Sequence, residues 1–345
     1  MKAAVLTAHG DLDVIRYVDD LPVPEPGFGE VRVRMKAAAL NRLDLFVRRG
    51  WKGLELDFPH PMGSDGAGII NALGPDVIGW QIGDAVGINP TIYSSQKPDG
   101  PYENQGKQVG ILGEDYPGSA RDYAIFPARN LHPVPDGFPF ADVAAAGLVG
   151  VTAWHSLITR GHLQAGETVL VVGAAGGVNS MSIQIAKLAG ATVYAVGSNA
   201  EKCQLANDLG ADVVINREET PEWSREVYKL THKRGVDVVV DNVGAATLND
   251  SIRSTAYGGR VLIVGGTTGY KAEINVAQLF TKHVSLIGST MGTQRDYTQV
   301  MDLLFAGRLR AVIGATFPLQ EARQAQELLE NNAVDGKVVL TLDES

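Results

Sequence analysis

One segment of the chain, from Thr168 to Lys202, limits the possible folds more than any other. It opens with Thr168–Val172, a short apolar and β-branched run typical of a strand buried on both faces. The small residues Gly173-Ala174-Ala175-Gly176-Gly177 follow at once. Apolar residues then recur at helical spacing up to Gly190, and a second strand is predicted at Thr192–Val196. Strand, tight turn, helix and strand therefore fit within the ~30 residues of one βαβ unit.

This arrangement predicts a binding site for a dinucleotide. The first turn of the helix has unpaired backbone N–H groups and the positive end of the helix dipole, and small turn residues let a pyrophosphate approach. We assign pyrophosphate contacts to Ala174, Gly176, Gly177 and Val178. With Gly176 as the middle glycine of G-x-G-x-x-G, the third position holds Asn179, which either donates a hydrogen bond near the phosphates or widens the contact between helix and strand.

The alternation of strands and helices continues after this unit. Four more apolar runs have the length of strands, with helical patterns between them: Val213–Ile215, Val236–Asp241, Arg260–Val264 and Val284–Ile287. Six strands separated by helices predict an α/β domain with a doubly wound parallel sheet.

The end of the second strand indicates which cofactor is bound. NAD-binding units of this type carry a carboxylate roughly twenty residues after the glycines, which holds the ribose 2′-hydroxyl. This chain has Gly197, Ser198 and Asn199 there, and its first carboxylate is Glu201 in the next helix. We therefore expect NADP(H), with the 2′-phosphate bound by Gly197, Ser198, Asn199, Lys202 and Arg217. Lys202 and Arg217 are alternatively ordinary surface charges.

Composition excludes several classes of function. The chain has 345 residues, enough for two domains, and a formal net charge of −9, which argues against a nucleic-acid or anionic-membrane surface. Cys203 is the only cysteine, so neither an internal disulfide nor a cysteine-rich zinc site is expected. The start lacks the apolar core of a signal peptide, and we expect no membrane span. We predict a cytoplasmic protein.

The first 130 residues have a different pattern, in which short strands are separated by proline and glycine. This spacing predicts a compact domain resembling a β-barrel. Its strands are expected at Ala3–Thr7, Glu30–Ala38, Gly68–Ala72, Ala85–Ile88 and Ala120–Phe126. A long polar loop is expected at 89–119, two helical runs at 140–146 and 151–160, two more helices at 295–306 and 320–331, and a last strand at 337–342 that returns to this domain.

The whole pattern resembles the medium-chain dehydrogenase/reductase (MDR) superfamily. The motifs that carry the resemblance extend over almost all of the chain: Leu40-Asn41-Arg42-Leu43-Asp44, Met62 to Gly68, Gly83-Asp84-Ala85-Val86, Thr152-Ala153-Trp154, the glycine turn, Asp241-Asn242-Val243-Gly244 and Asp335 to Leu340. The resemblance implies a GroES-like β-barrel domain at 1–151, a Rossmann domain at 152–289 and a return segment at 290–345 that completes the first domain.

Departures from the family pattern point to a subfamily without zinc. In zinc alcohol dehydrogenases a cysteine stands at the position of Asn41, and a His-Glu pair at Ser64-Asp65. The segment that supplies a third ligand holds Leu148 and Val149. Zinc prefers thiolate, imidazole or carboxylate, and Asp65 is the one such group left. The 89–119 loop, which matches the family's structural zinc lobe, contains no cysteine. We expect no metal, and the chain is similar to the zinc-free quinone oxidoreductases.

This resemblance implies a hydride transfer to an acceptor that delocalises negative charge, such as a quinone or an enone, since no metal polarises an alcohol oxygen. We assign the catalytic site to Asn41, Asp44 and Asp65, with the Asn41 amide as the hydrogen-bond donor to the acceptor oxygen. Structural roles for all three residues remain open alternatives. The nicotinamide end of NADP(H) is expected to contact Asn41, Thr152, Asn242, Val243, Gly265, Gly266, Thr267, Ser289 and Lys337.

Two other functions remain open. An enoyl-thioester reductase of the same family usually carries a tyrosine shortly after the equivalent of Gly50, where this chain has Trp51 and Lys52. A non-catalytic NADPH-binding redox sensor is the second alternative. Relatives of this kind commonly pair the edge strands of two Rossmann sheets, so we also expect a homo-oligomer, either a dimer or a tetramer.

Overall fold

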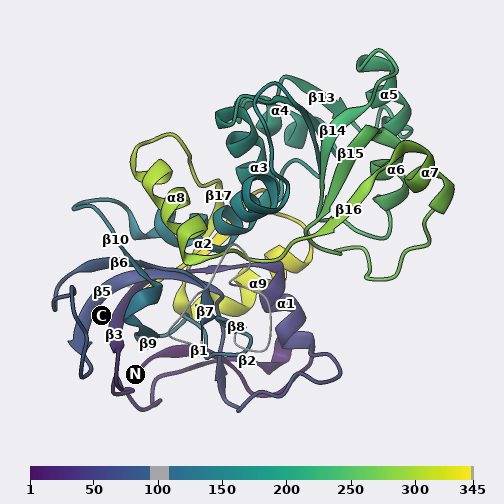
Figure 1. Cartoon of the computed structure of the whole chain (residues 1–345). Helices are drawn as coiled ribbons and strands as arrows, with labels where there is room; N and C mark the ends of the chain where they lie inside the picture. The colour runs from purple at the N-terminus through teal and green to yellow at the C-terminus, as the bar shows by residue number, and fades with distance from the viewer. Residues whose placement is uncertain (94–108, 343–345) are drawn as a thin grey trace. The chain divides into compact units, whose positions relative to one another are not determined.

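The computed structural model describes residues 1–93 and 109–342. The chain divides into two compact units. Unit 1 comprises residues 1–148 and 293–345, and unit 2 comprises residues 149–292. Figure 1 shows both units and labels their helices and strands where there is room.

Unit 1 is a β-rich domain with helices near its C-terminal return. Its strands are β1 (Ala3–Leu6), β2 (Ile15–Val18), β3 (Glu30–Leu40), β4 (His60–Pro61), β5 (Asp65–Leu73), β6 (Ala85–Ile88), β7 (Thr91–Tyr93), β8 (Val109–Ile111), β9 (Tyr123–Pro127), β10 (Leu131–Pro133), β17 (Ile313–Pro318) and β18 (Lys337–Thr341). Its helices are α1 (Arg42–Arg49), the first part of α2 (Phe140–Trp154), α8 (Gln294–Phe305) and α9 (Ala322–Glu330), with 3₁₀ turns at Leu12–Val14, Ala128–Asn130 and Leu319–Glu321.

Strand β3 is the centre of unit 1. Its sequence alternates buried and partly exposed residues along the first seven positions, and its last four are all buried. It pairs with β5 along most of its length, with β9 near its start and with β18 at its end. The main sheet runs in the order β10-β6-β5-β3-β18-β17, with β9 joined to β3. The expected return of the last strand to the first domain is therefore confirmed.

Unit 2 contains a parallel six-stranded sheet in the order β13-β12-β11-β14-β15-β16. Its strands are β11 (Thr168–Val172), β12 (Thr192–Gly197), β13 (Val213–Asn216), β14 (Val236–Asp241), β15 (Thr255–Ile263) and β16 (Ser285–Gly288). Its helices are α3 (Gly177–Leu188), α4 (Ala200–Asp208), α5 (Trp223–Leu230), α6 (Leu248–Ser254) and α7 (Val276–Lys282). One half of the sheet runs outward from β11 through β12 to β13, and the other runs outward from β14 through β15 to β16. This order confirms the predicted doubly wound Rossmann sheet.

Two predictions for unit 1 were wrong in detail. The 89–119 loop includes a small antiparallel sheet, in which β7 pairs with β8, and its residues 94–108 lie outside the described part of the chain. The two helical runs expected after Pro139 form one helix, α2, which passes through Gly147 and continues as a π-helical turn at His155–Arg160. The helix is continuous because apolar packing on both sides outweighs the low helix propensity of glycine.

The same helical stretch bears on the expectation about membrane spans. Phe140–Arg160 is long and apolar enough to cross a membrane by length and composition. However, 78% of its most apolar window is buried within the structure, as expected for a core helix.

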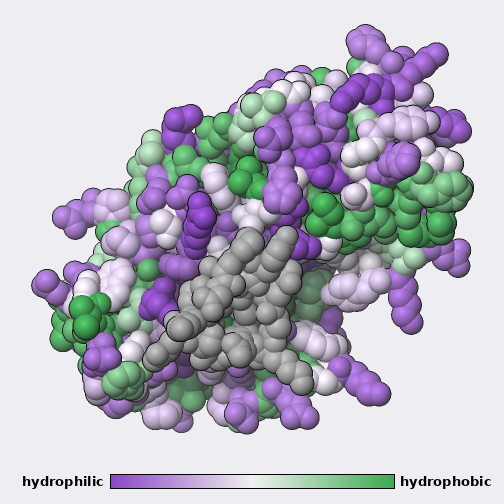
Figure 2. Space-filling view, viewed as in Figure 1, coloured by the Kyte–Doolittle hydropathy of each residue, from purple (hydrophilic) through white to green (hydrophobic). Residues whose placement is uncertain are grey.

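Unit 2 also exposes several large apolar side chains. Tyr257 and Tyr270 are 76% and 78% exposed, and Val276 and Phe280 of α7 are 61% and 66% exposed. Figure 2 shows hydrophobic residues gathered over the α6–α7 side of this unit. Strand β16 pairs with β15 alone among the described strands, so it is an edge of the sheet.

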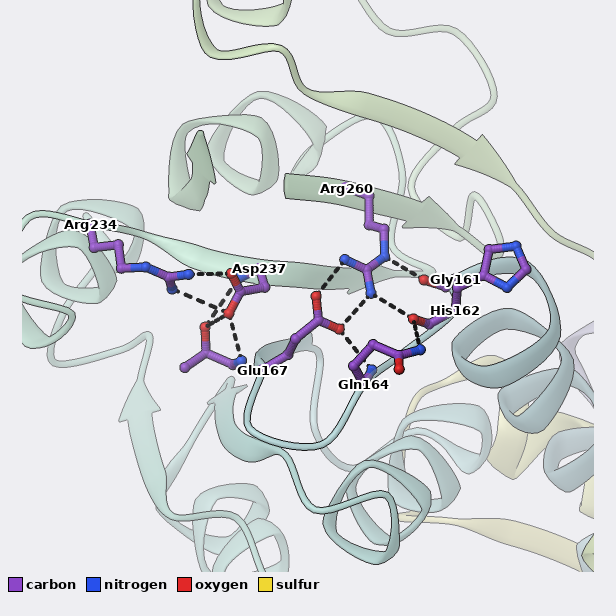
Figure 3. A network of polar contacts seen from close by, with 8 residues as sticks. Gly161, His162, Gln164, Glu167, Arg234, Asp237 and Arg260 are labelled. Carbon is purple, nitrogen blue, oxygen red and sulfur yellow. Dashed lines mark hydrogen bonds and ion pairs between the residues drawn. The ribbon is translucent and has the colours of Figure 1, made fainter. Parts of the chain in front are cut away.

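A network of charged residues lies near the amino ends of the unit 2 strands (Figure 3). The Arg260 guanidinium binds both carboxylate oxygens of Glu167, at 2.9 and 2.7 Å, and also donates to backbone carbonyls of Gly161 and His162. Asp237 accepts hydrogen bonds from Arg234 and from the backbone N–H and hydroxyl of Thr168. These contacts fix the loop that leads from the π-helical turn into β11.

Candidate active site

The predicted catalytic residues of unit 1 meet because three neighbouring strands place them at one level. Leu40, the last residue of β3, pairs with Val338 of β18, and Ala39 pairs with Asp65 of β5. Asn41 follows Leu40, and Lys337 precedes Val338. The first turn of α1 then brings in Asp44. We call Asn41, Asp44, Ser64, Asp65 and Lys337 the polar cluster.

Asn41 is the N-cap residue of α1, and its backbone is fixed there. Its N–H donates to Asp44 Oδ2 at 2.8 Å, as the acidic third residue of a helix accepts in a capping box. The same carboxylate accepts from the backbone N–H of Gly63 at 2.9 Å and from the Ser64 hydroxyl at 2.7 Å. Asp44 therefore ties the start of α1 to the chain just before β5.

The side-chain amide of Asn41 is fully used inside the cluster. Its Nδ2 donates to Ser64 Oγ at 2.9 Å and to Asp65 Oδ2 at 2.8 Å, and its Oδ1 accepts from Lys337 Nζ. The ammonium can only donate and the Asp65 carboxylate can only accept, so these two neighbours dictate which way the amide points. The expected donation from Asn41 to an acceptor oxygen stays a prediction, and both amide protons already have acceptors here.

Asp65 and Lys337 form a buried ion pair. Lys337 Nζ lies 3.0 Å from Asp65 Oδ2, and the two side chains are 3% and 0% exposed respectively. The other oxygen of Asp65 accepts from the backbone N–H of Leu148 at 2.5 Å. Burial raises the pKa of Asp65, while the charge of Lys337 and the Asn41 hydrogen bond act to lower it. Burial likewise raises the pKa of Asp44, against its hydrogen bonds from Ser64 and from backbone N–H groups.

The donor set of the cluster is poorly suited to a metal ion. It offers an amide, a hydroxyl and two carboxylates, whereas zinc prefers thiolate, imidazole and carboxylate. One carboxylate, Asp65, is already paired with an ammonium group, and the other, Asp44, already accepts from two backbone N–H groups and the Ser64 hydroxyl. In residues 1–93 and 109–342, no group of three or more His, Cys, Asp or Glu side chains is arranged to hold a metal ion.

Two residues near the cluster were not among the sequence predictions. Ser64 connects Asp44 to Asn41, and its place beside Asp65 in the family motif was the available signal. Tyr297 of α8 is fully buried, and burial together with the nearby charge of Asp65 raises its pKa well above the usual range. Its hydroxyl has no hydrogen-bond partner among the described residues, and no sequence motif indicated it.

In unit 2, the glycine turn and the start of α3 have the geometry of an anion site. The backbone N–H groups of Gly173 and Ala174 both donate to Val196 O at 3.0 Å, which holds the turn against β12. Gly173 has φ +88°, a conformation that favours glycine. Gly176 is the N-cap of α3 and provides no side-chain cap, so the first turn keeps donors for a ligand. Gly177 and Val178 are the first two residues of α3, and their contact with a pyrophosphate stays a prediction.

Asn179 acts differently from both interpretations of the sequence. Its Nδ2 lies within hydrogen-bond distance of three acceptors, Val172 O at 2.7 Å, Gly173 O at 2.6 Å and Asn242 Oδ1 at 3.1 Å, which share its two protons. The side chain is 1% exposed, and its Oδ1 has no described partner. Asn179 therefore links the turn after β11 to the end of β14, where a third glycine would leave these carbonyls without a donor.

The residues expected around the 2′-phosphate gather at the ends of β12 and β13. The backbone N–H of Arg217 donates to Gly197 O at 2.9 Å, and Asn199 caps α4 by accepting from Lys202 N at 2.9 Å. A Cβ at Gly197 would lie 2.6 Å from Cys203 Sγ, so a larger residue does not fit there. Ser198 lies between Gly197 and Asn199 in the sequence, and the side chain of Arg217 is exposed.

The residues expected at the nicotinamide end follow β14, β15 and β16. Asn242 and Val243 come directly after Asp241, whose carboxylate accepts from Val243 N, Gly244 N, Thr247 Oγ1 and Ser251 Oγ. Thr267, after Gly265 and Gly266, donates its N–H to Asn242 O at 3.4 Å, and Ser289 N donates to Ile263 O at 3.0 Å. The hydroxyl oxygens of Thr152 and Ser289 are buried without a partner among the described residues.

Two family models match separate segments of the chain. The model of the alcohol dehydrogenase GroES-like domain matches residues 27–136, and that of the zinc-binding dehydrogenase family matches residues 177–306. A zinc-type alcohol dehydrogenase-like protein of Schizosaccharomyces pombe is 34% identical over 91% of both chains, and the quinone oxidoreductase of Homo sapiens is 28% identical over 99% of this chain and 98% of its own. The crystal structure of an NAD-dependent alcohol dehydrogenase has a TM-score of 0.95 and 40% identity, covering 99% of this chain and 100% of its own.

The two matched models cover more than half of the chain, and its sheets have the architecture that the models describe. The chain therefore belongs to the medium-chain dehydrogenase/reductase superfamily, a family of oxidoreductases.

Proposed function

We propose that this protein transfers a hydride from NADPH to a quinone or an α,β-unsaturated carbonyl and uses no zinc. The observation that carries the proposal is the polar cluster of unit 1. Positions that hold zinc ligands in related alcohol dehydrogenases hold Asn41, Ser64 and Asp65, and the Lys337 ammonium donates to two of them. A fixed positive charge there disfavours a second cation by electrostatic repulsion. The similarity to the human quinone oxidoreductase supports the same interpretation.

The class of acceptor follows from the proposed zinc-free site. An alcohol or simple aldehyde needs its oxygen polarised strongly before hydride moves, which a metal ion achieves. A quinone or enone spreads the developing negative charge over several atoms, so hydrogen bonds and a nearby fixed charge are sufficient. When bound, the nicotinamide supplies the hydride chemistry, and the polar cluster stabilises charge on the acceptor.

Residues of unit 2 fit a nicotinamide dinucleotide. The uncapped first turn of α3 suits a pyrophosphate, and the buried hydroxyls of Thr152 and Ser289 lack partners that a carboxamide group can provide. The β12 end presents Gly197, Ser198 and Asn199 with no carboxylate, which favours NADP(H) over NAD(H).

A side-by-side assay of cofactors and acceptors tests this proposal. We expect NADPH to bind at least tenfold more tightly than NADH by fluorescence titration, and NADPH to be oxidised with 1,4-benzoquinone or a small enone by protein that contains no zinc. An enoyl thioester is assayed in parallel, because it is the substrate expected for the alternative function, an enoyl-thioester reductase. Equal affinity for both cofactors contradicts the NADP(H) assignment. Stoichiometric zinc, or turnover confined to alcohols, contradicts the whole proposal.

We also propose that the protein is a homo-oligomer that associates through unit 2. Strand β16 is one edge of the described sheet, and Val276 and Phe280 of α7 expose apolar side chains in the same unit. Pairing two such edges buries unpaired backbone groups and apolar surface together. Light scattering is expected to give a dimer or a tetramer, and a monomer contradicts this part.

A further inference from the structure

The polar cluster contains a cation whose hydrogen-bonding capacity is not filled. An ammonium group has three N–H donors. Within the described residues, Lys337 Nζ has two acceptors, Asn41 Oδ1 and Asp65 Oδ2. The side chain is 3% exposed, so bulk water solvates it little. Burying an N–H donor without an acceptor costs free energy, so a further oxygen atom bound to this ammonium would be stabilising.

The surroundings of Lys337 hold this group in one place. Its backbone N–H donates to Val312 O at 2.8 Å, and β18 is paired on both sides, with β3 and with β17. Asp65, which anchors the ammonium, is itself anchored by Leu148 N and by the Asn41 amide. The positive charge is therefore preorganised, as groups that stabilise a developing charge need to be.

We propose that the Lys337 ammonium is the permanent cation of the active site, and that its third N–H binds the acceptor oxygen that becomes negatively charged on reduction. Lys337 thus takes the electrostatic role of a metal ion, and Asn41 is a positioning residue that orients it. The inference rests on the proposed function. The acceptor gains a hydride from reduced nicotinamide and a proton from water, which leaves oxidised nicotinamide, and Lys337 keeps all of its own protons.

The geometry favours Lys337 over Asn41 for this contact. Both protons of the Asn41 amide are directed to Ser64 and Asp65, so Asn41 has none left to offer. A hydrogen bond from a charged donor is also roughly twice as strong as one from a neutral amide.

The first test compares variants that remove the charge in different ways. Lys337→Gln removes the charge and keeps an N–H donor. The double variant Lys337→Met with Asp65→Asn removes cation and anion together, so no buried charge is left without a partner. Lys337→Arg keeps the charge. Lys229→Met is the matched control, since Lys229 is an exposed residue of α5 paired with Glu226.

We expect both charge-removing variants to lower kcat/KM for the quinone by about 100-fold, the loss typical for one oxyanion-stabilising donor. The Kd for NADPH should stay within threefold, Lys337→Arg should retain activity within tenfold of the wild type, and Lys229→Met should be unchanged. Turnover within threefold of wild type in a folded double variant overturns the proposal.

A second readout does not depend on turnover. 4-Nitrophenol imitates an oxygen that carries negative charge, and its ionisation is visible by absorbance. Bound to the wild-type NADP⁺ complex, it should ionise at lower pH than in water, and this shift should vanish in the double variant and persist in Lys229→Met. If the wild type reduces no quinone or enone yet shows the shift, the proposed function fails and the cation site stands. If the wild type shows no shift, the cation site fails.

Discussion

Lys337 Nζ lies 3.0 Å from Asp65 Oδ2, and neither side chain is more than 3% exposed. The two residues are far apart in the sequence. Lys337 is on β18 and Asp65 is on β5, and these two strands lie on either side of β3 in the sheet. The pair is therefore a property of the completed sheet of unit 1, and its loss should affect folding as well as chemistry.

Breaking this ion pair on one side should destabilise the protein strongly. Asp65→Ala leaves the ammonium buried without its anion, and such a change typically lowers the free energy of unfolding by about 3–5 kcal/mol. Urea denaturation at pH 7 measures the effect. The control is Glu222→Gln, which removes an exposed pair with Arg225 and should change stability by less than about 0.5 kcal/mol. Equal effects of the two substitutions contradict the importance of the buried pair.

Glu114 should make unit 1 less stable as the pH rises. Burial, together with the charge of Asp115, raises the pKa of Glu114 from its usual 4.5 to about 7. Between these values the folded chain holds a proton that the unfolded chain has released, so stability falls as the pH rises through this window. Glu114→Gln should therefore raise Tm at pH 8 and leave it almost unchanged at pH 4. Glu327 is an exposed residue of α9, so the control Glu327→Gln should change Tm equally little at pH 4 and pH 8. If Glu114→Gln raises Tm by the same amount at both pH values, the raised pKa is not the cause.

The sheet of unit 2 could be predicted from the sequence because its strands are short apolar runs bounded by glycine and polar residues. The predicted bounds of the first strand, Thr168–Val172, and of Val236–Asp241 match β11 and β14. In unit 1, helix α1 and the strands β2, β4, β10 and β17 were missed, besides the small sheet of β7 and β8. Asn41, Asp44 and Gly50 carry the start and stop signals of α1, but the same residues also fit a chemical role, and the helix has only 8 residues.

The polar cluster could be predicted only in part. Asn41 and Asp65 stood out as departures from a zinc-ligand pattern, and Asp44 belongs to the same family motif as Asn41. The direction of each hydrogen bond, however, depends on the register of β3 with β5 and β18. The contact of Lys337 with the cofactor stays a prediction, and its burial beside Asp65 could not be predicted because a lysine near the C-terminus gives no sign of it. The contacts of Asn179 likewise depend on the approach of β14 to the glycine turn, which a sequence pattern does not encode.

Glu167 should stabilise unit 2 at neutral pH and lose this effect in acid. Hydrogen bonds from Arg260 hold the pKa of Glu167 below its usual value, so the unfolded chain binds the proton more readily. The stabilisation is present above the unfolded pKa and is lost as the pH falls through the lower, folded one. Glu167→Gln should lower the free energy of unfolding by about 1–3 kcal/mol at pH 7. Urea titrations at successively lower pH should show a shrinking difference in the free energy of unfolding between variant and wild type. A difference that does not change with pH contradicts this role of Glu167.

Gly147 should resist substitution although it lies inside helix α2. Gly→Ala within a helix usually stabilises by up to about 1 kcal/mol. Here a Cβ would lie 2.4 Å from Asp65 Oδ1, and Asp65 cannot retreat without weakening its contacts to Lys337, Asn41 and Leu148. Gly147→Ala should therefore lower the free energy of unfolding by about 1–3 kcal/mol, the range for an overpacked core.

The control for this prediction is Gly288→Ala at the end of β16. No atom lies within 4 Å of a Cβ at that position, and Gly288 does not need a positive φ, so stability should change little. Because the clash in Gly147→Ala falls on the anchor of Lys337, the variant should also lose the ionisation shift of bound 4-nitrophenol, which Gly288→Ala should keep. A Gly147→Ala protein that is as stable as wild type and retains that shift shows that Asp65 tolerates displacement, which means that β18 and Asn41 hold the ammonium in place without a fixed Asp65.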